Sequence, residues 1–223
     1  MTNSKIEFDI TFVHTGEVHV ATFNSLIEST DPTLSVNHIV NSNLLDRAMK
    51  QQNRAELETE IHSIMQLAAQ ESRLVVCTCS SIGEMAETTP VVPKGVVTRV
   101  DRPMAEQAVK IGGNVLVVAA LESTLAPTLD LLNAIKLQCE SDVTFDVLCV
   151  TEAWQYFERG DSQRYIELIA QAIESEKGEY NAIVLAQASM AKVSERLNCW
   201  KIPILSSPRL GVEVAVKNIN NYK

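Results

Sequence analysis

The sequence predicts an α/β protein made of two pseudo-symmetric lobes, each with a mainly parallel four-stranded sheet flanked by helices. Two observations predict this. Short apolar runs of strand length alternate along the chain with segments whose apolar residues recur at helical spacing. A weak internal repeat relates Val76–Ile82 to Val184–Met190, and its alignment places Cys79 opposite Gln187 and Ser81 opposite Ser189. We therefore expect two similar lobes with the functional site in the cleft between them.

The strands are predicted from their apolar content. Ile6–Val13 alternates apolar with polar residues, and Arg73–Cys79 is a continuous apolar run typical of a strand buried on both faces. Val36–Val40 is either an edge strand or a loop. The remaining predicted strands are Gly95–Val100, Asn114–Leu121, Val143–Thr151, Asn181–Gln187 and Ile202–Leu205.

Helices are predicted between these strands. Arg54–Gln70 carries an apolar stripe at helical spacing, and a second helix is expected to begin at the cap pair Ser123 and Thr124. His19 and His62 are expected on helix surfaces. The other predicted helices are Pro103–Ile111, Ser162–Glu174, Met190–Leu197 and Arg209–Asn218.

The repeat also predicts where one lobe ends and the other begins. The chain is expected to cross near Val100–Arg102 and to return near Trp200–Pro203. This division gives a first lobe of residues 1–101 with 203–223, and a second lobe of residues 102–202. The C-terminal helix is then expected to pack on the first lobe.

Composition narrows the classes of function. The chain has 223 residues, 46% apolar and 21% charged, which is ordinary for a globular protein. A net charge of −9 offers little to a phosphate backbone, so no nucleic-acid partner is expected. No apolar run approaches the length of a membrane-spanning helix, and the opening MTNSKIEFDI lacks the features of a signal peptide. We expect a cytoplasmic protein that does not bind membranes.

Cysteines, histidines and glycines do not form a known metal or nucleotide motif. An odd number of cysteines argues against a disulfide framework, and Cys77 and Cys79 are too close together for a zinc knuckle. The four histidines form no H-E-x-x-H pattern, and no glycine-rich phosphate loop is present in the sequence. We therefore expect neither a metal nor another cofactor. The five cysteines are Cys77, Cys79, Cys139, Cys149 and Cys199.

Polar residues follow several predicted strands, at the edge where parallel sheets bind ligands. Three of these strand ends place hydroxyl side chains where a helix begins, which favours a small carboxylate as ligand. Cys79 stands at one of them, and the dipole of the following helix is expected to lower its pKa. A buried structural cysteine is the alternative for Cys79, and Cys77 is expected in the core. The strand ends are His14-Thr15, Cys79-Ser80-Ser81, Glu122-Ser123-Thr124 and Gln187-Ala188-Ser189.

These motifs together resemble the signature blocks of the aspartate/glutamate/hydantoin racemase superfamily. The resemblance rests on the blocks Val76–Ser81, Ala119–Thr124, Val184–Met190 and Pro203–Pro208, which occur in the family's order and cover most of the chain. It implies a two-lobed α/β fold, a cofactor-independent reaction at a small carboxylate or amino acid, and a site between the lobes. It also implies that Cys79 is the first catalytic cysteine of the family.

The sequence differs from the family's pattern at one catalytic position. The second catalytic cysteine of the family would fall on Gln187, and an amide neither supplies nor takes a proton at neutral pH. His14 is the other candidate acid or base. The alternative is that His14 is a structural residue at the strand end whose ring is hydrogen-bonded within the protein. The carboxylate would be held by Ser80 and Ser81, with Thr15, Ser123, Thr124, Ala188 and Ser189 as further anchors.

Three functions remain open at this point. A racemase-family enzyme would act with Cys79 as its one cysteine acid or base. A non-racemising relative would use the same thiol for decarboxylation, as the similar arylmalonate decarboxylases do with one cysteine, or for isomerisation, as in the related maleate isomerases, which generally keep a second cysteine. A catalytically degenerate relative would bind a carboxylate without turnover, and Gln187 favours this reading. Homo-oligomers are common among soluble enzymes, and the oligomeric state is left open.

Overall fold

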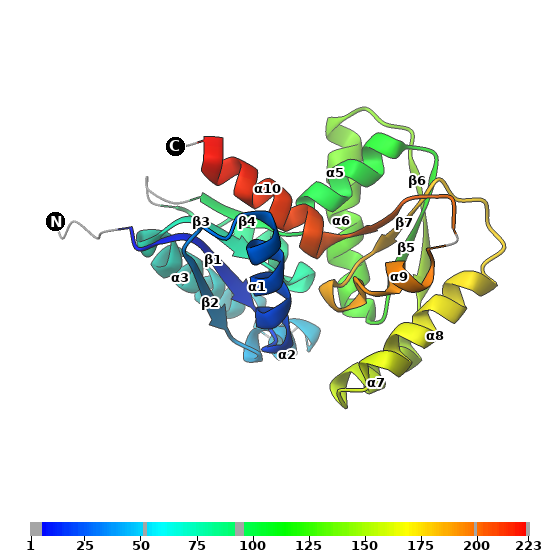
Figure 1. The fold of residues 1–223 in the computed structure, drawn as a ribbon, viewed down its shortest axis with the longest axis horizontal. Helices are drawn as coiled ribbons and strands as arrows, with labels where there is room; N and C mark the ends of the chain where they lie inside the picture. The colour runs from blue at the N-terminus through cyan, green and yellow to red at the C-terminus, as the bar shows by residue number, and fades with distance from the viewer. Residues whose placement is uncertain (1–5, 51–52, 92–95, 199, 222–223) are drawn as a thin grey trace. The chain divides into compact units, whose positions relative to one another are not determined.

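The structure, a computed structural model, describes residues 6–50, 53–91, 96–198 and 200–221 (Figure 1). It divides into two compact units, Met1–Arg102 with Pro208–Lys223 and Pro103–Ser207. Each unit carries one four-stranded sheet in which every pair of neighbouring strands is parallel. The predicted fold class is confirmed. Cys199 and the first residue of the predicted strand Gly95–Val100 lie outside the described residues.

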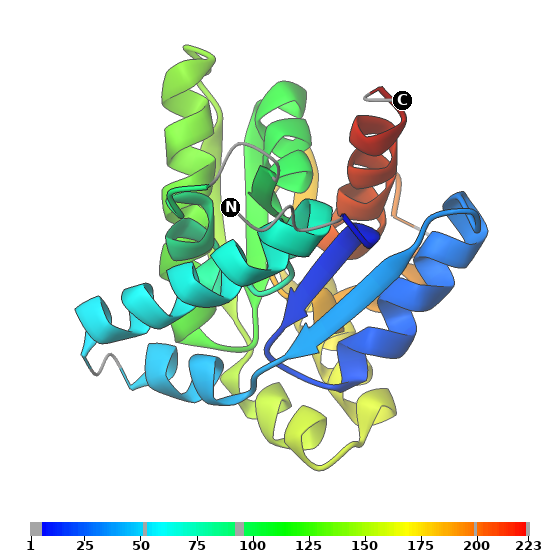
Figure 2. The same cartoon turned by 90° about the vertical axis from the view of Figure 1, so that its left-hand side faces the viewer.

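The sheet of the first unit is covered by helices on both faces. Its strands β1 (Phe8–His14), β2 (Val36–Val40), β3 (Ser72–Cys77) and β4 (Val96–Arg99) lie in the order β2-β1-β3-β4. Alternate residues of β3 point to opposite faces, as the pleat requires. Leu74 and Val76 pack with α1 (Val18–Thr30) and α10 (Ser207–Asn221). Val75 and Cys77 pack on the other face with α2 (Asn43–Met49), α3 (Arg54–Glu71) and α4 (Gly83–Glu87), as Figure 2 shows for α3.

The second unit repeats this plan. Its strands β5 (Asn114–Ala119), β6 (Thr144–Cys149), β7 (Ala182–Leu185) and β8 (Ile204–Ser206) lie in the order β6-β5-β7-β8. One face packs against α7 (Thr151–Glu158), α8 (Ser162–Ser175) and α9 (Val193–Arg196). The remaining helices of this unit are α5 (Arg102–Ile111) and α6 (Glu122–Gln138). Both sheets thus begin with an inner strand, add an edge strand on one side, and then add two strands on the other.

Several predicted boundaries are wrong by a residue or two at the strand ends. Strands β3, β5 and β7 end at Cys77, Ala119 and Leu185, two residues before the predicted ends. The residues beyond them stay extended but leave the ladder, since Cys79 has φ −110° and ψ 117° and Gln187 has φ −120° and ψ 138°. Val36–Val40 is an edge strand, one of the two alternatives left open by the sequence.

Helix α6 begins earlier than predicted. Its N-cap is Leu121, and Glu122 and Ser123 already lie in its first turn, so the expected Ser123–Thr124 cap pair is wrong. The predicted helix Met190–Leu197 is in fact two short pieces, a 3-10 turn at Ala188–Met190 and α9. Within the described ranges, none of the helices combines the length and apolar character needed to span a membrane.

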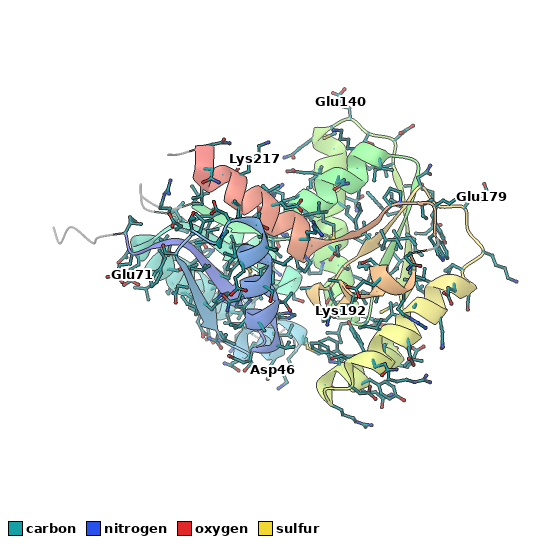
Figure 3. All side chains as sticks on the ribbon, viewed as in Figure 1. Asp46, Glu71, Glu140, Glu179, Lys192 and Lys217 are labelled. Carbon is teal, nitrogen blue, oxygen red and sulfur yellow. The ribbon has the colours of Figure 1, made fainter. Side chains whose placement is uncertain are left out.

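Charged side chains lie on the outside of each unit. The six labelled in Figure 3, Asp46, Glu71, Glu140, Glu179, Lys192 and Lys217, are all exposed. The few charged residues that are buried therefore need a separate explanation, because an ion loses its hydration on burial.

Candidate functional site

The internal repeat places two equivalent turns at the carboxyl ends of β3 and β7. Each strand is followed by two extended residues and then a three-residue 3-10 helix, Ser80–Ile82 in the first unit and Ala188–Met190 in the second. Cys79 and Gln187 are the N-caps of these helices. The N–H of Ile82 donates to the Cys79 carbonyl at 3.3 Å, and the N–H of Met190 donates to the Gln187 carbonyl at 3.0 Å. The alignment predicted from sequence is therefore confirmed residue by residue.

Cys79 is half-buried, and donors of its own unit surround its thiol. The hydroxyls of Thr15 and Ser81 and the backbone N–H groups of Ser81 and Ile82 all hydrogen-bond to the sulfur and favour the thiolate. Burial outweighs them, so the pKa of the Cys79 thiol is raised above its ordinary value. The predicted lowering of this pKa is therefore wrong. A turn of three residues has too few aligned peptides to provide the dipole that the sequence argument assumed.

Gln187 is buried, and its side chain is fixed by the backbone of its own unit. The N–H of Ala120 donates to Oε1 of Gln187 at 2.6 Å. Ala120 follows β5 as Thr15 follows β1, so Thr15 and Ala120 occupy equivalent positions beside Cys79 and Gln187. Nε2 of the same amide is a hydrogen-bond donor.

His14 is fully buried at the end of β1 and belongs to a hydrogen-bonded chain. Its Nδ1 lies 2.8 Å from Oγ1 of Thr78, and its Nε2 lies 2.8 Å from Nδ1 of His38. Nε2 of His38 lies 2.9 Å from Oδ1 of Asn24. Because a carbonyl oxygen only accepts, neutral His38 donates to Asn24 and neutral His14 donates through Nε2 to His38. The single proton of the Thr78 hydroxyl has two acceptors in reach, Nδ1 of His14 and the Val13 carbonyl oxygen at 3.1 Å. Both ring nitrogens of His14 are thus engaged within the first unit.

Burial keeps this histidine group neutral. The pKa of His14 is lowered to about 3, first by burial and then by the neighbouring His38 and His19. Burial also lowers the pKa of His38, against an opposing effect of Glu17. His19 is half-buried and its ring centroid lies 6.3 Å from that of His14, so its predicted place on a helix surface is wrong. His62 is partly exposed on α3.

The remaining predicted anchors fall into two groups. Ser80 is buried and Ser81 half-buried in the turn after Cys79, beside the buried Thr15. In the second unit, Ala188 and Ser189 follow Gln187, and the Ser189 hydroxyl hydrogen-bonds the Tyr165 hydroxyl at 2.9 Å. Thr124 is buried in α6, and Oγ of Ser123 is buried with no hydrogen-bond partner among the described residues. An unpartnered hydroxyl of this kind is available to a bound polar group.

Sequence reasoning missed one feature beside the thiol. Arg99, at the end of β4, and Asp101 form an ion pair with side chains only 3% and 1% exposed. The carboxylate of Asp101 accepts hydrogen bonds from Nε and Nη2 of Arg99. The signal was present in the sequence as Arg-Val-Asp, because alternate residues of an extended segment point to the same side. Cys77 is fully buried in the core, as predicted.

Metal ligands are not gathered anywhere in the described part of the chain. No group of three or more His, Cys, Asp and Glu side chains in that part could hold a metal ion. The candidate residues are a thiol, hydroxyls and backbone N–H groups in the first unit, and an amide with hydroxyls in the second.

The fold resembles solved structures that are named as racemases and as a decarboxylase. An aspartate racemase from Picrophilus torridus has a TM-score of 0.72 at 15% identity, with 95% of this chain and 94% of that chain covered. A glutamate racemase from Thermus thermophilus has a TM-score of 0.71 at 12% identity, with 98% and 82% covered. A variant of arylmalonate decarboxylase has a TM-score of 0.55 at 17% identity, with 96% and 94% covered.

Sequence-level comparisons give no assignment. No protein-family model matches the chain, and no curated protein matches it either. The chain shares its fold with these solved structures of an aspartate racemase and a glutamate racemase, and the predicted resemblance is confirmed at the level of the fold.

Proposed function

We propose that this protein is a racemase-family enzyme that transfers a proton at the α-carbon of a small carboxylate or amino acid, without a cofactor, and that Cys79 is its single cysteine acid or base. One observation carries the proposal. The residue Cys79 is half-buried, and its thiol lies among two hydroxyls and two backbone N–H groups that favour the thiolate against the burial that raises its pKa.

The raised pKa of Cys79 indicates the direction in which the proton moves most easily. A thiol whose pKa is above its ordinary value rests as S–H at neutral pH, and it therefore acts first as a proton donor. In a decarboxylation, the bond between the α-carbon and a carboxylate breaks, CO2 leaves, and the electron pair remains on the α-carbon. Cys79 then gives its proton to that carbon and becomes a thiolate, which takes a proton from water. This direction makes a single-thiol decarboxylase the nearest alternative to a racemase.

Gln187 limits the reaction to one proton-transferring thiol. Inversion of a stereocentre by two bases needs an acceptor on one face of the carbon and a donor on the other. Gln187 occupies the position equivalent to Cys79, and its amide does not titrate. An amide nitrogen such as its Nε2 is suited instead to donating a hydrogen bond to a substrate carboxylate.

A carboxylate-binding protein without turnover is a second candidate, and Gln187 is the observation that favours it. The two candidates make different predictions for Cys79→Ala. The enzyme loses turnover on removal of the sulfur, whereas a binding protein keeps its affinity and has no turnover to lose.

The experiment combines a ligand screen with matched cysteine variants. Thermal-shift assays over small dicarboxylates, amino acids and α-substituted malonates identify a ligand, and NMR in D2O then follows exchange or decarboxylation. We expect wild-type protein and Cys149→Ala to be active, because Cys149 lies at the end of edge strand β6. We expect Cys79→Ala to bind the ligand without turnover. Turnover that persists in Cys79→Ala would exclude the proposed role of this thiol.

A further inference from the structure

A buried ion pair lies directly beside the turn that carries Cys79. Nε and Nη2 of Arg99 donate to the two carboxylate oxygens of Asp101 at 2.6 and 2.9 Å. Both side chains are almost completely buried, at 3% and 1% exposure. Removing two ions from water is costly, and an apolar pair of similar volume is often as stable or more stable. Stability alone therefore does not account for Arg99 at this place.

The guanidinium also contacts the turn itself. Nη2 of Arg99 donates to the carbonyl oxygen of Ser80 at 3.4 Å. A Cβ added at Gly83 would lie 2.7 Å from Cζ of Arg99, so the backbone of the turn closes on the guanidinium with no space for a side chain. The arginine thus contacts the turn at Ser80 and again at Gly83.

The geometry of one peptide group connects Arg99 to the thiol. The carbonyl of Ser80 and the N–H of Ser81 belong to the same peptide unit, which is planar and trans, so they point in opposite directions. Arg99 holds the carbonyl, and the N–H of Ser81 hydrogen-bonds the sulfur of Cys79. We propose that Arg99 is a positioning residue, which holds the Ser80 carbonyl and thereby directs the N–H of Ser81 at the Cys79 sulfur.

Asp101 has a role in the same arrangement. Its carboxylate accepts two hydrogen bonds from the guanidinium of Arg99, which fixes the plane of that group. In this orientation Nη2 of Arg99 also donates to the Ser80 carbonyl oxygen. The inference rests on the proposed function in one respect only, because the proposed function is what makes the Cys79 thiol important. Its test needs neither substrate nor turnover.

The experiment measures the alkylation rate of Cys79 as a function of pH. Rates with iodoacetamide are followed by fragment-resolved mass spectrometry, which separates Cys79 from the buried Cys77. The principal variant is the double substitution Arg99→Met with Asp101→Leu, which removes both charges and leaves no unpaired ion in the core. Arg73→Met is the matched control. Arg73 also pairs with an aspartate, Asp9, at 2.9 Å and donates to a backbone carbonyl, that of Ile219, at 3.1 Å, but it lies at the opposite end of β3.

We expect the double variant to fold, and the apparent pKa for alkylation of Cys79 to rise by about one unit, because the N–H of Ser81 is no longer held toward the sulfur. Alkylation at a pH below that pKa then slows roughly tenfold. Arg73→Met should leave the alkylation profile unchanged. A folded double variant with the wild-type profile would overturn the proposal.

Arg99→Lys keeps the test decisive if the double variant does not fold. Lysine preserves the charge beside Asp101 but lacks the planar fork that contacts Asp101 and Ser80 together. We expect it to raise the apparent alkylation pKa of Cys79, and an unchanged value would again overturn the proposal. If these shifts occur while Cys79→Ala keeps full turnover, the positioning role stands and the proposed function fails.

Discussion

Acid should destabilise the first unit through His14, and the size of the effect follows from its burial. His14 is fully buried, and its pKa is lowered from 6.5 to about 3 in the folded protein. The unfolded chain therefore binds a proton at a higher pH than the folded chain does. The stabilising contribution is fully present above pH 6.5 and is lost as the pH falls from 6.5 toward 3. At about 1.4 kcal/mol per pKa unit, the whole loss is of the order of 4 to 5 kcal/mol, shared with the neighbouring His38 and His19.

The assay is urea unfolding followed by far-UV circular dichroism at several pH values, with amide exchange in β1 and β3 as a probe of the first unit. His14→Gln is the test variant, and His62→Gln, on the surface of α3, is the control. Carboxylates also titrate in this range, so the informative quantity is the difference in slope between variant and wild type. We expect His14→Gln to flatten the loss of stability between pH 6.5 and 4 by up to about 1.4 kcal/mol per pH unit. Equal slopes in His14→Gln and wild type would refute the reasoning.

Two further predictions concern the second unit, where both tryptophans, Trp154 and Trp200, allow unfolding to be followed by intrinsic fluorescence. Gln187→Ala leaves the buried N–H of Ala120 without its acceptor and should lower the free energy of unfolding by about 1–3 kcal/mol; a loss below about 0.5 kcal/mol would show that this bond contributes little. Tyr165→Phe keeps the buried ring but removes the hydrogen bond to Ser189, so it should cost about 1 kcal/mol. A cost above 3 kcal/mol would instead point to disrupted packing.

Sequence patterning predicted the interior of the elements better than their ends. Apolar runs such as Val115–Val118 are buried on both faces, and that requirement leaves a clear signal. The ends of β3 and β7 were placed too late because Cys79 and Gln187 keep an extended backbone after the ladder stops. No bounds were predicted for helix α1, although His19 was expected on a helix, since only Phe23 and Ile27 on α1 are buried and the apolar stripe is correspondingly short.

The residues of the candidate site stay a prediction from the sequence, and the electrostatics of Cys79 could not be predicted from it. The repeat alone indicated that Cys79 and Gln187 are equivalent, and the structure gives both the same turn. The pKa of Cys79 was predicted with the wrong sign, because the balance between burial and hydrogen bonding depends on tertiary packing. The link from His14 to His38 and on to Asn24 joins β1, β2 and α1, and no local pattern brings these three together.

The stereochemistry of proton transfer in D2O tests most directly whether one thiol acts alone. With an amino acid or other chiral carboxylate as substrate, we expect deuterium to enter the α-carbon with retention of configuration, and with a prochiral α-substituted malonate we expect one enantiomer of the product. Incorporation should be absent in Cys79→Ala. A racemic product from wild-type protein, or incorporation that survives in Cys79→Ala, would contradict chemistry carried by this single sulfur.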